Sequence, residues 1–166
     1  MASLRPLSCL LPLALTAPLL AAGAQRPTVR VGLGGGVAGA PVTGRAHRGS
    51  SPHALATLGL APRRGIAELR LDALWLMGNS DVGPVSMGAN ALAPLGSVGV
   101  GSVGRLRPYV VAGAGVYGVG GVGPRVGAAG GAGTRLERPR LALFAEARHH
   151  TAHRSTFGTL GLTFSR

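Results

Sequence analysis

The sequence of 166 residues has no lysine, one cysteine, few acidic residues and few aromatic ones. Its 17 basic residues are all arginine and stand against five acidic residues, so the formal net charge is +12. The absence of lysine excludes Schiff-base chemistry and a P-loop lysine. The single cysteine, Cys9, lies in an apolar leader, so we expect the exported chain to hold no disulfide, thiolate nucleophile or cysteine-ligated metal.

Residues 1–24 have the pattern of a secretory signal peptide. Arg5 supplies the positive start, Leu10–Leu20 an apolar run, and Ala22-Gly23-Ala24 a small-residue cleavage site. The apolar run is too short to cross a membrane as a helix, and no later stretch holds about 18 uncharged apolar residues. We therefore expect an exported chain in which residues 25–166 form a single domain.

Apolar and polar residues alternate along most of the exported part, in runs bounded by turn residues. Such alternation is typical of strands with two different faces, and helical periodicity is nearly absent. A strand crosses a bilayer in about 9–11 residues, and the runs have about that length. The sequence predicts eight strands, over residues 28–38, 53–61, 66–77, 85–93, 109–118, 126–136, 141–149 and 156–166. The stretch 94–108 is either a long glycine-rich turn, which we favour, or an extra strand.

Glycine is abundant, with 29 residues, and this composition would normally indicate a flexible chain. Here the glycines mostly interrupt apolar alternation instead of forming glycine-serine runs, so disorder is the less favoured interpretation. The pattern G-x-G-x-x-G occurs four times, first at Gly34–Gly39. A dinucleotide site needs a helix after this pattern and then an acid about 20 residues further on. A polar loop follows Gly39 and the next acid is Glu68, so we expect no cofactor.

Two of the expected strands carry charges on a single face. Glu68, Arg70 and Asp72 share one face of the third strand, and Glu146 and Arg148 share one face of the seventh. An arginine on the lipid face of a barrel costs about 2–4 kcal/mol at the bilayer midplane, so we expect these charges to point inward. The third and seventh strands of an eight-stranded barrel lie across a lumen that side chains fill, where opposite charges pair. The expected lumen charge network consists of Arg30, Glu68, Arg70, Asp72, Glu146 and Arg148. A soluble β-sandwich with a wet charged face is the less favoured alternative.

Membrane barrels usually carry aromatic girdles at both interfaces, and this sequence has six aromatic residues. Four of them fall near strand ends, as girdles require: Trp75, Tyr109, Tyr117 and Phe164. Phe144 and Phe157 fall on inward positions of their strands. The alternation does not settle which way Tyr109 and Tyr117 point.

His149, His150 and His153 cluster near Ser155. One interpretation is a metal site or a Ser–His pair, since His153-Arg154-Ser155 is similar to the His-x-Ser of outer-membrane lipid A deacylases. That family needs a later acid and none follows Ser155, so we favour a polar surface loop. We expect no catalytic residue and no metal ligand.

The arginines gather in the connections between the expected strands. Nucleic acid fits poorly as a partner, because stacking aromatics are scarce and the chain is exported. Arginine pairs well with phosphate, so four loop arginines are candidates for facing lipopolysaccharide at the outer surface. These candidates are Arg45, Arg48, Arg125 and Arg154. Solvated positive loops are an equally good interpretation.

Three segments carry a resemblance to a known family: Arg-Pro-Tyr-Val-Val-Ala-Gly-Ala-Gly at 107–115, Leu-Phe-Ala-Glu-Ala-Arg at 143–148 and Thr-Leu-Gly-Leu-Thr-Phe at 159–164. The chain resembles the small outer-membrane β-barrels of the type of the OmpA transmembrane domain and OmpX. The resemblance implies an all-β fold, an eight-stranded antiparallel transmembrane β-barrel, in the outer membrane of a Gram-negative type of cell. The family usually closes on an aromatic residue, whereas here Phe164 is third from last and Arg166 is terminal.

We therefore expect a monomeric outer-membrane barrel with a filled lumen, which has a structural or surface-interaction role and no catalytic activity. Its expected partners are outer-membrane lipids, lipopolysaccharide and, during assembly, the barrel-insertion machinery. One alternative is a secreted or periplasmic glycine- and arginine-rich protein that binds polyanions. A lipid-modifying outer-membrane enzyme is the third interpretation.

Overall fold

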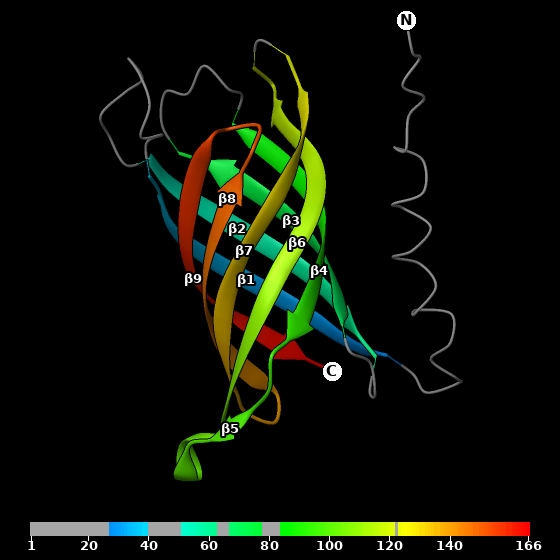
Figure 1. Ribbon diagram of the computed structural model, residues 1–166, viewed down its shortest axis with the longest axis vertical. Helices are drawn as coiled ribbons and strands as arrows, with labels where there is room; N and C mark the ends of the chain where they lie inside the picture. The colour runs from blue at the N-terminus through cyan, green and yellow to red at the C-terminus, as the bar shows by residue number, and fades with distance from the viewer. Residues whose placement is uncertain (1–26, 40–50, 63–66, 78–83, 122) are drawn as a thin grey trace, which may run out of the picture.

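The computed structural model describes residues 27–39, 51–62, 67–77, 84–121 and 123–166. These residues form a closed antiparallel barrel of eight long strands, with one short strand attached (Figure 1). The long strands are β1 (Thr28–Ala38), β2 (Ser51–Ala61), β3 (Glu68–Leu76), β4 (Val85–Pro94), β6 (Arg105–Val119), β7 (Arg125–Glu137), β8 (Leu141–His150) and β9 (Ser155–Ser165). Pairing of β1 with β9 and of β4 with β6 completes the ring. The predicted fold class, an all-β eight-stranded antiparallel barrel, is confirmed.

The connection between β4 and β6 differs most from the prediction. It is neither a plain turn nor a full extra strand, because it contains β5 (Val98–Gly99) and a short 3-10 helix, η2 (Gly101–Val103). β5 pairs with the first two residues of β6, which begins at Arg105 and not at Tyr109. Figure 1 shows this hairpin projecting beyond one end of the barrel. Among the described residues no helix is long and apolar enough to cross a membrane.

The two ends of the barrel are distinguished by the connections they carry. β1 starts and β9 ends at one end, which we call the terminal mouth, and the turn between β7 and β8 lies there too. The opposite end, which we call the far mouth, carries the turn between β8 and β9. In Figure 1 that turn is at the top, and the C-terminus lies toward the lower end. The expected signal peptide, residues 1–24, lies outside the described residues.

Side chains along each strand point alternately outward and inward. In β3, Leu71 and Trp75 are 52% and 60% exposed, whereas Arg70 and Asp72 are buried. Each long strand exposes at least one large apolar side chain: Leu33, Leu58, Leu71, Met87, Val110, Val126, Leu143 and Leu160. Soluble monomers rarely expose continuous apolar surface on this scale. The outside of the barrel is therefore an apolar belt.

The aromatic residues divide between the two faces of the barrel wall. Phe144 and Phe157 are buried inside, as their positions predicted. Tyr109 and Tyr117, whose direction the sequence left open, are each 3% exposed and also lie in the lumen, so they do not contribute to outer girdles. Trp75 and Phe164 do point outward, near opposite ends of the barrel. The alternation around the tyrosines gave no direction, because small or apolar residues occupy both faces of β6.

Inward-facing glycines make room for the large side chains of the lumen. A methyl group on Gly133 would lie 2.6 Å from the hydroxyl oxygen of Tyr109, and one on Gly161 would lie 2.5 Å from the ring of Phe144. Such distances are well inside van der Waals contact. Glycine at these two inward positions therefore lets large side chains pack inside the barrel.

Candidate functional site

A ring of four charged side chains crosses the middle of the lumen. Arg70 of β3 contacts Asp72 through Nε and Oδ1 at 2.8 Å, and Glu146 of β8 through Nη2 and Oε2 at 2.9 Å. Arg148 of β8 contacts Asp72 Oδ2 through Nη1 at 2.6 Å and Glu146 Oε1 through Nε at 2.5 Å. Each arginine thus touches both carboxylates. The four residues, which we call the central ring, link two strands across the lumen.

Two neutral side chains add hydrogen bonds to the central ring. The Tyr109 hydroxyl donates to Glu146 Oε2 at 2.8 Å, and the Asn90 amide donates to Asp72 Oδ2 at 2.9 Å. The charged side chains of the ring are at most 5% exposed. Removing a charge from water costs several kcal/mol per ion, and only good partners offset that cost. The central ring therefore stabilises the barrel as a complete set.

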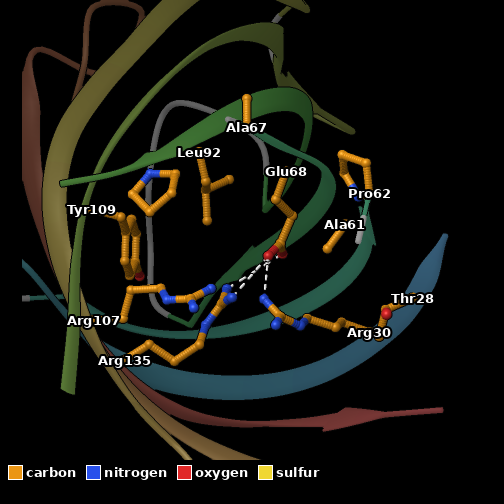
Figure 2. Close-up of a pocket in the computed structure, with 11 residues that line it drawn as sticks. Thr28, Arg30, Ala61, Pro62, Ala67, Glu68, Leu92, Arg107, Tyr109 and Arg135 are labelled. Carbon is orange, nitrogen blue, oxygen red and sulfur yellow. Dashed lines mark hydrogen bonds and ion pairs between the residues drawn. The ribbon is translucent and has the colours of Figure 1, made fainter. Parts of the chain in front are cut away.

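A second group of charges, which we call the mouth cluster, lies at the terminal mouth (Figure 2). Glu68 is bound by Arg30 through Nη1 at 2.5 Å and by Arg135 through Nη1 at 2.8 Å. Glu137 accepts from Arg30 Nη2 at 3.2 Å, and its other oxygen lies 3.5 Å from Nε of Arg107. Three guanidinium groups therefore share two carboxylates.

The six residues expected in one lumen network divide between these two groups. Arg30 and Glu68 belong to the mouth cluster, and the other four form the central ring. Arg107, Arg135 and Glu137 were not among the predicted lumen residues. Arg107 and Glu137 had been assigned to connections, because the ends of β6 and β7 were placed too far inward. Arg135 and Glu137 lie two residues apart, and that spacing within β7 was a usable signal.

Histidine and aromatic rings close the lumen toward the far mouth. The ring of His150 packs edge-on against Tyr117 at 5.2 Å and lies 4.6 Å from Phe157, between centroids. The ring of His153 lies 5.3 Å from Tyr117 and its Nε2 is 3.3 Å from Ser86 Oγ. Burial, and to a smaller extent the charge of Arg125, lowers the pKa of His153. These rings form a mixed aromatic and imidazole layer above the central ring.

The prediction that the histidines and Ser155 form a polar surface loop is therefore only partly correct. His149 is exposed, but His150 and Ser155 are buried, because they occupy inward positions at the ends of β8 and β9. The Nε2 atom of His153 meets Ser86 and not Ser155. Within the described part of the chain, no group of three or more His, Cys, Asp or Glu is placed to hold a metal ion.

Two of the four loop arginines can be placed. Arg125 is the first residue of β7 and Arg154 lies in the turn between β8 and β9, and both are exposed at the far mouth. Arg45 and Arg48 lie outside the described residues. Arg125 and Arg154 therefore lie at the same end of the barrel, opposite the mouth cluster.

Comparison with known proteins identifies similar folds. No protein-family model and no curated protein sequence matches the chain. The N-terminal β-barrel domain of Pseudomonas aeruginosa OprF superimposes with a TM-score of 0.61 at 18% identity, over 85% of this chain and 98% of that chain. Neisserial surface protein A (NspA) gives a TM-score of 0.51 at 17% identity, over 86% of this chain and 97% of that chain. The chain thus has the closed eight-stranded fold of the small OmpA-like outer-membrane barrels, as the sequence resemblance implied.

Proposed function

We propose that this protein is an outer-membrane barrel with a structural or surface-interaction role, a filled lumen and no catalytic activity. The observation that carries the proposal is the difference in polarity between the outer and inner faces of the barrel wall. Large apolar side chains cover the outside on each long strand, while the central ring and the mouth cluster are inside. A closed ring of strands satisfies its own backbone, which is the condition for crossing a bilayer.

A filled lumen favours a scaffold over a wide channel. Eight strands leave an interior just wide enough for side chains. Here that interior holds the central ring, the tyrosines and the layer of His150, His153 and Phe157. Because side chains occupy the interior, we propose that the protein interacts with its partners at its two ends and on its lipid-facing surface.

The expected partners follow from the placement of exposed arginine. Arg125 and Arg154 lie at the far mouth, and the guanidinium group binds phosphate with a planar fork of donors. We propose that the far mouth faces the outer surface and that these arginines meet lipopolysaccharide phosphates. Before it reaches the membrane, the chain depends on the barrel-insertion machinery, and the folded form is proposed to be a monomer.

Heat-modifiable migration tests the proposal. The chain of residues 25–166, folded into detergent micelles, should run differently on a detergent gel before and after boiling, because a closed barrel resists unfolding by detergent. Circular dichroism of the same sample should show a β spectrum. Identical mobility together with a coil spectrum would contradict the proposal and favour the secreted polyanion binder.

The enzyme alternative finds little support at the far mouth. A nucleophile and its base need to lie within hydrogen-bond reach, with a third group orienting the base. Among the described residues, Nε2 of His153 lies 3.3 Å from Ser86 Oγ, and the rings beside His153 are those of Tyr117, His150 and Phe157, none of which carries a carboxylate. A scaffold accounts for these rings as packing that closes the lumen.

A further inference from the structure

The side chains that fill the middle of the lumen leave a hollow at the terminal mouth. A cavity of about 190 Å³ opens there, and its wall includes Arg30, Glu68, Arg107, Tyr109 and Arg135 (Figure 2). Figure 2 shows the three arginine side chains reaching toward the region where the Glu68 carboxylate lies. Structural support of the barrel wall alone does not require such an opening.

The cavity carries positive charge that the protein does not fully neutralise. Arg107 makes one ion pair among the described residues, the 3.5 Å contact with Glu137, and its side chain is 36% exposed. Nε of Arg135 is buried and has no hydrogen-bond partner among the described residues. A buried donor without a partner is costly, because it has lost its hydrogen bonds to water. Arg107 thus has exposed donors, and Arg135 keeps one buried N–H without a partner among the described residues.

The remaining wall suits the uncharged part of a small ligand. Leu92 and Pro94 line one side, and the ring of Tyr109 stands beside the guanidinium of Arg135, whose Cζ is 5.5 Å from the ring centroid. The Tyr109 hydroxyl is already bound to Glu146, so the tyrosine offers its ring and not its oxygen. The cavity therefore combines a cationic wall with an apolar one.

We propose that this cavity binds a small oxyanion, a carboxylate or a phosphate, at the terminal mouth. Guanidinium groups bind both anions through two parallel N–H···O bonds, and Arg107 supplies the exposed donors for them. Arg135 adds positive charge beside them, because Glu68 already holds both of its terminal nitrogens. Glu68 holds Arg30 and Arg135 in place, and Glu137 competes with the ligand for Arg107. The site is distinct from the proposed contacts at the far mouth, which lies at the other end of the barrel.

Calorimetric titration of the folded chain in micelles tests the site, with sodium phosphate and sodium acetate as separate probes at constant ionic strength. We expect saturable binding of at least one probe, and the stronger of the two identifies the preferred anion. Arg107→Gln should weaken that binding roughly tenfold, because it removes the most accessible fork of donors. Arg107→Lys should weaken it less, because the charge stays but the fork is lost. Glu137→Gln should strengthen it, because the competing carboxylate is gone.

Arg140→Gln is the matched control. Arg140 is exposed at the same end, in the turn between β7 and β8, and lies outside the wall of the cavity. It removes the same charge and should leave the affinity within about twofold, as expected for a surface charge far from the contact. Heat-modifiable migration of every variant confirms that the barrel has formed. Absence of saturable binding to the folded parent, or an equal loss in Arg107→Gln and Arg140→Gln, would overturn the proposal.

Discussion

Glu146 is the residue on which the central ring depends most directly. Its carboxylate contacts Arg70 and Arg148 and accepts a hydrogen bond from Tyr109. Removing one partner of a buried ion pair leaves the other charge unpaired in a medium that solvates it poorly. The ring is therefore sensitive to loss of charge without loss of volume.

We expect Glu146→Gln to lower the free energy of unfolding by about 3 kcal/mol, since both arginines lose one of their two carboxylates and the buried ring is left with an excess positive charge. Denaturant titration of the refolded barrel in micelles measures the change. Glu137→Gln is the matched control, because Glu137 is more exposed and its contacts are longer, and it should cost no more than about 1 kcal/mol. Equal effects of the two substitutions would contradict the central role of the ring but would leave the fold intact.

The quality of the prediction for each strand depended on how strongly its two faces differ. β3 was predicted well, because charged and apolar residues alternate along its first half. The inward direction of Glu68, Arg70 and Asp72 followed from the cost of exposing charge to lipid. β7 was harder, because glycine and alanine fill both of its faces until Arg135. Small residues carry little directional signal in a sequence.

The candidate sites were predictable only where charge lay inside a well-defined strand. The ion pair between Arg70 and Glu146 joins residues far apart in sequence. It could be predicted because their strands lie across the lumen of an eight-stranded barrel. The cavity at the terminal mouth could not be predicted from the sequence. It depends on where β6 begins and on which of the arginines is only partly paired by the carboxylates. That balance is a property of packing in three dimensions.

The apolar belt offers a test at the level of a single strand. Leu160 points outward from β9 and is 69% exposed. If lipid covers the belt, Leu160→Arg should destabilise the barrel in lipid vesicles by about 2–4 kcal/mol, the cost of arginine near the midplane. Unfolding by denaturant in vesicles measures the loss. Val98 is the matched control, because it is 63% exposed but lies on β5, in the hairpin that projects beyond one end of the barrel (Figure 1).

Val98→Arg should change stability by no more than about 0.5 kcal/mol, as surface substitutions in water do. A soluble barrel would tolerate both arginines equally, because each side chain would be in water. A neutral Leu160→Arg in vesicles would therefore contradict the membrane assignment of the belt.

On the scale of the whole molecule, the described acidic residues are confined to the lumen, whereas arginine lies both in the lumen and at the two ends of the barrel. The acidic residues that the structure describes, Glu68, Asp72, Glu137 and Glu146, all belong to the central ring or the mouth cluster. Five arginines neutralise them there, namely Arg30, Arg70, Arg107, Arg135 and Arg148. The other arginines that the structure describes are exposed and lie at the two ends of the barrel: Arg105, Arg125, Arg138, Arg140, Arg154 and Arg166. Such a distribution suits a protein whose ends face anionic lipid head groups.

The proposed orientation in the membrane can be tested with single cysteines. The far mouth is proposed to face the outside, so a cysteine there should be reached from the medium, and one at the terminal mouth should be protected in intact cells. The chain favours this experiment, because its single cysteine, Cys9, lies in the expected signal peptide. Arg154→Cys and Arg140→Cys place equivalent exposed thiols in turns at opposite ends.

We expect a membrane-impermeant maleimide to label Arg154→Cys in intact cells and to label Arg140→Cys only after the outer membrane is opened. The unsubstituted chain should remain unlabelled in both conditions, which also shows that Cys9 has been removed with the leader. If Arg140→Cys alone were labelled in intact cells, the orientation in the membrane would be the opposite of the proposed one. In that case the anion cavity would open to the outside, and Arg125 and Arg154 would face the periplasm instead of lipopolysaccharide.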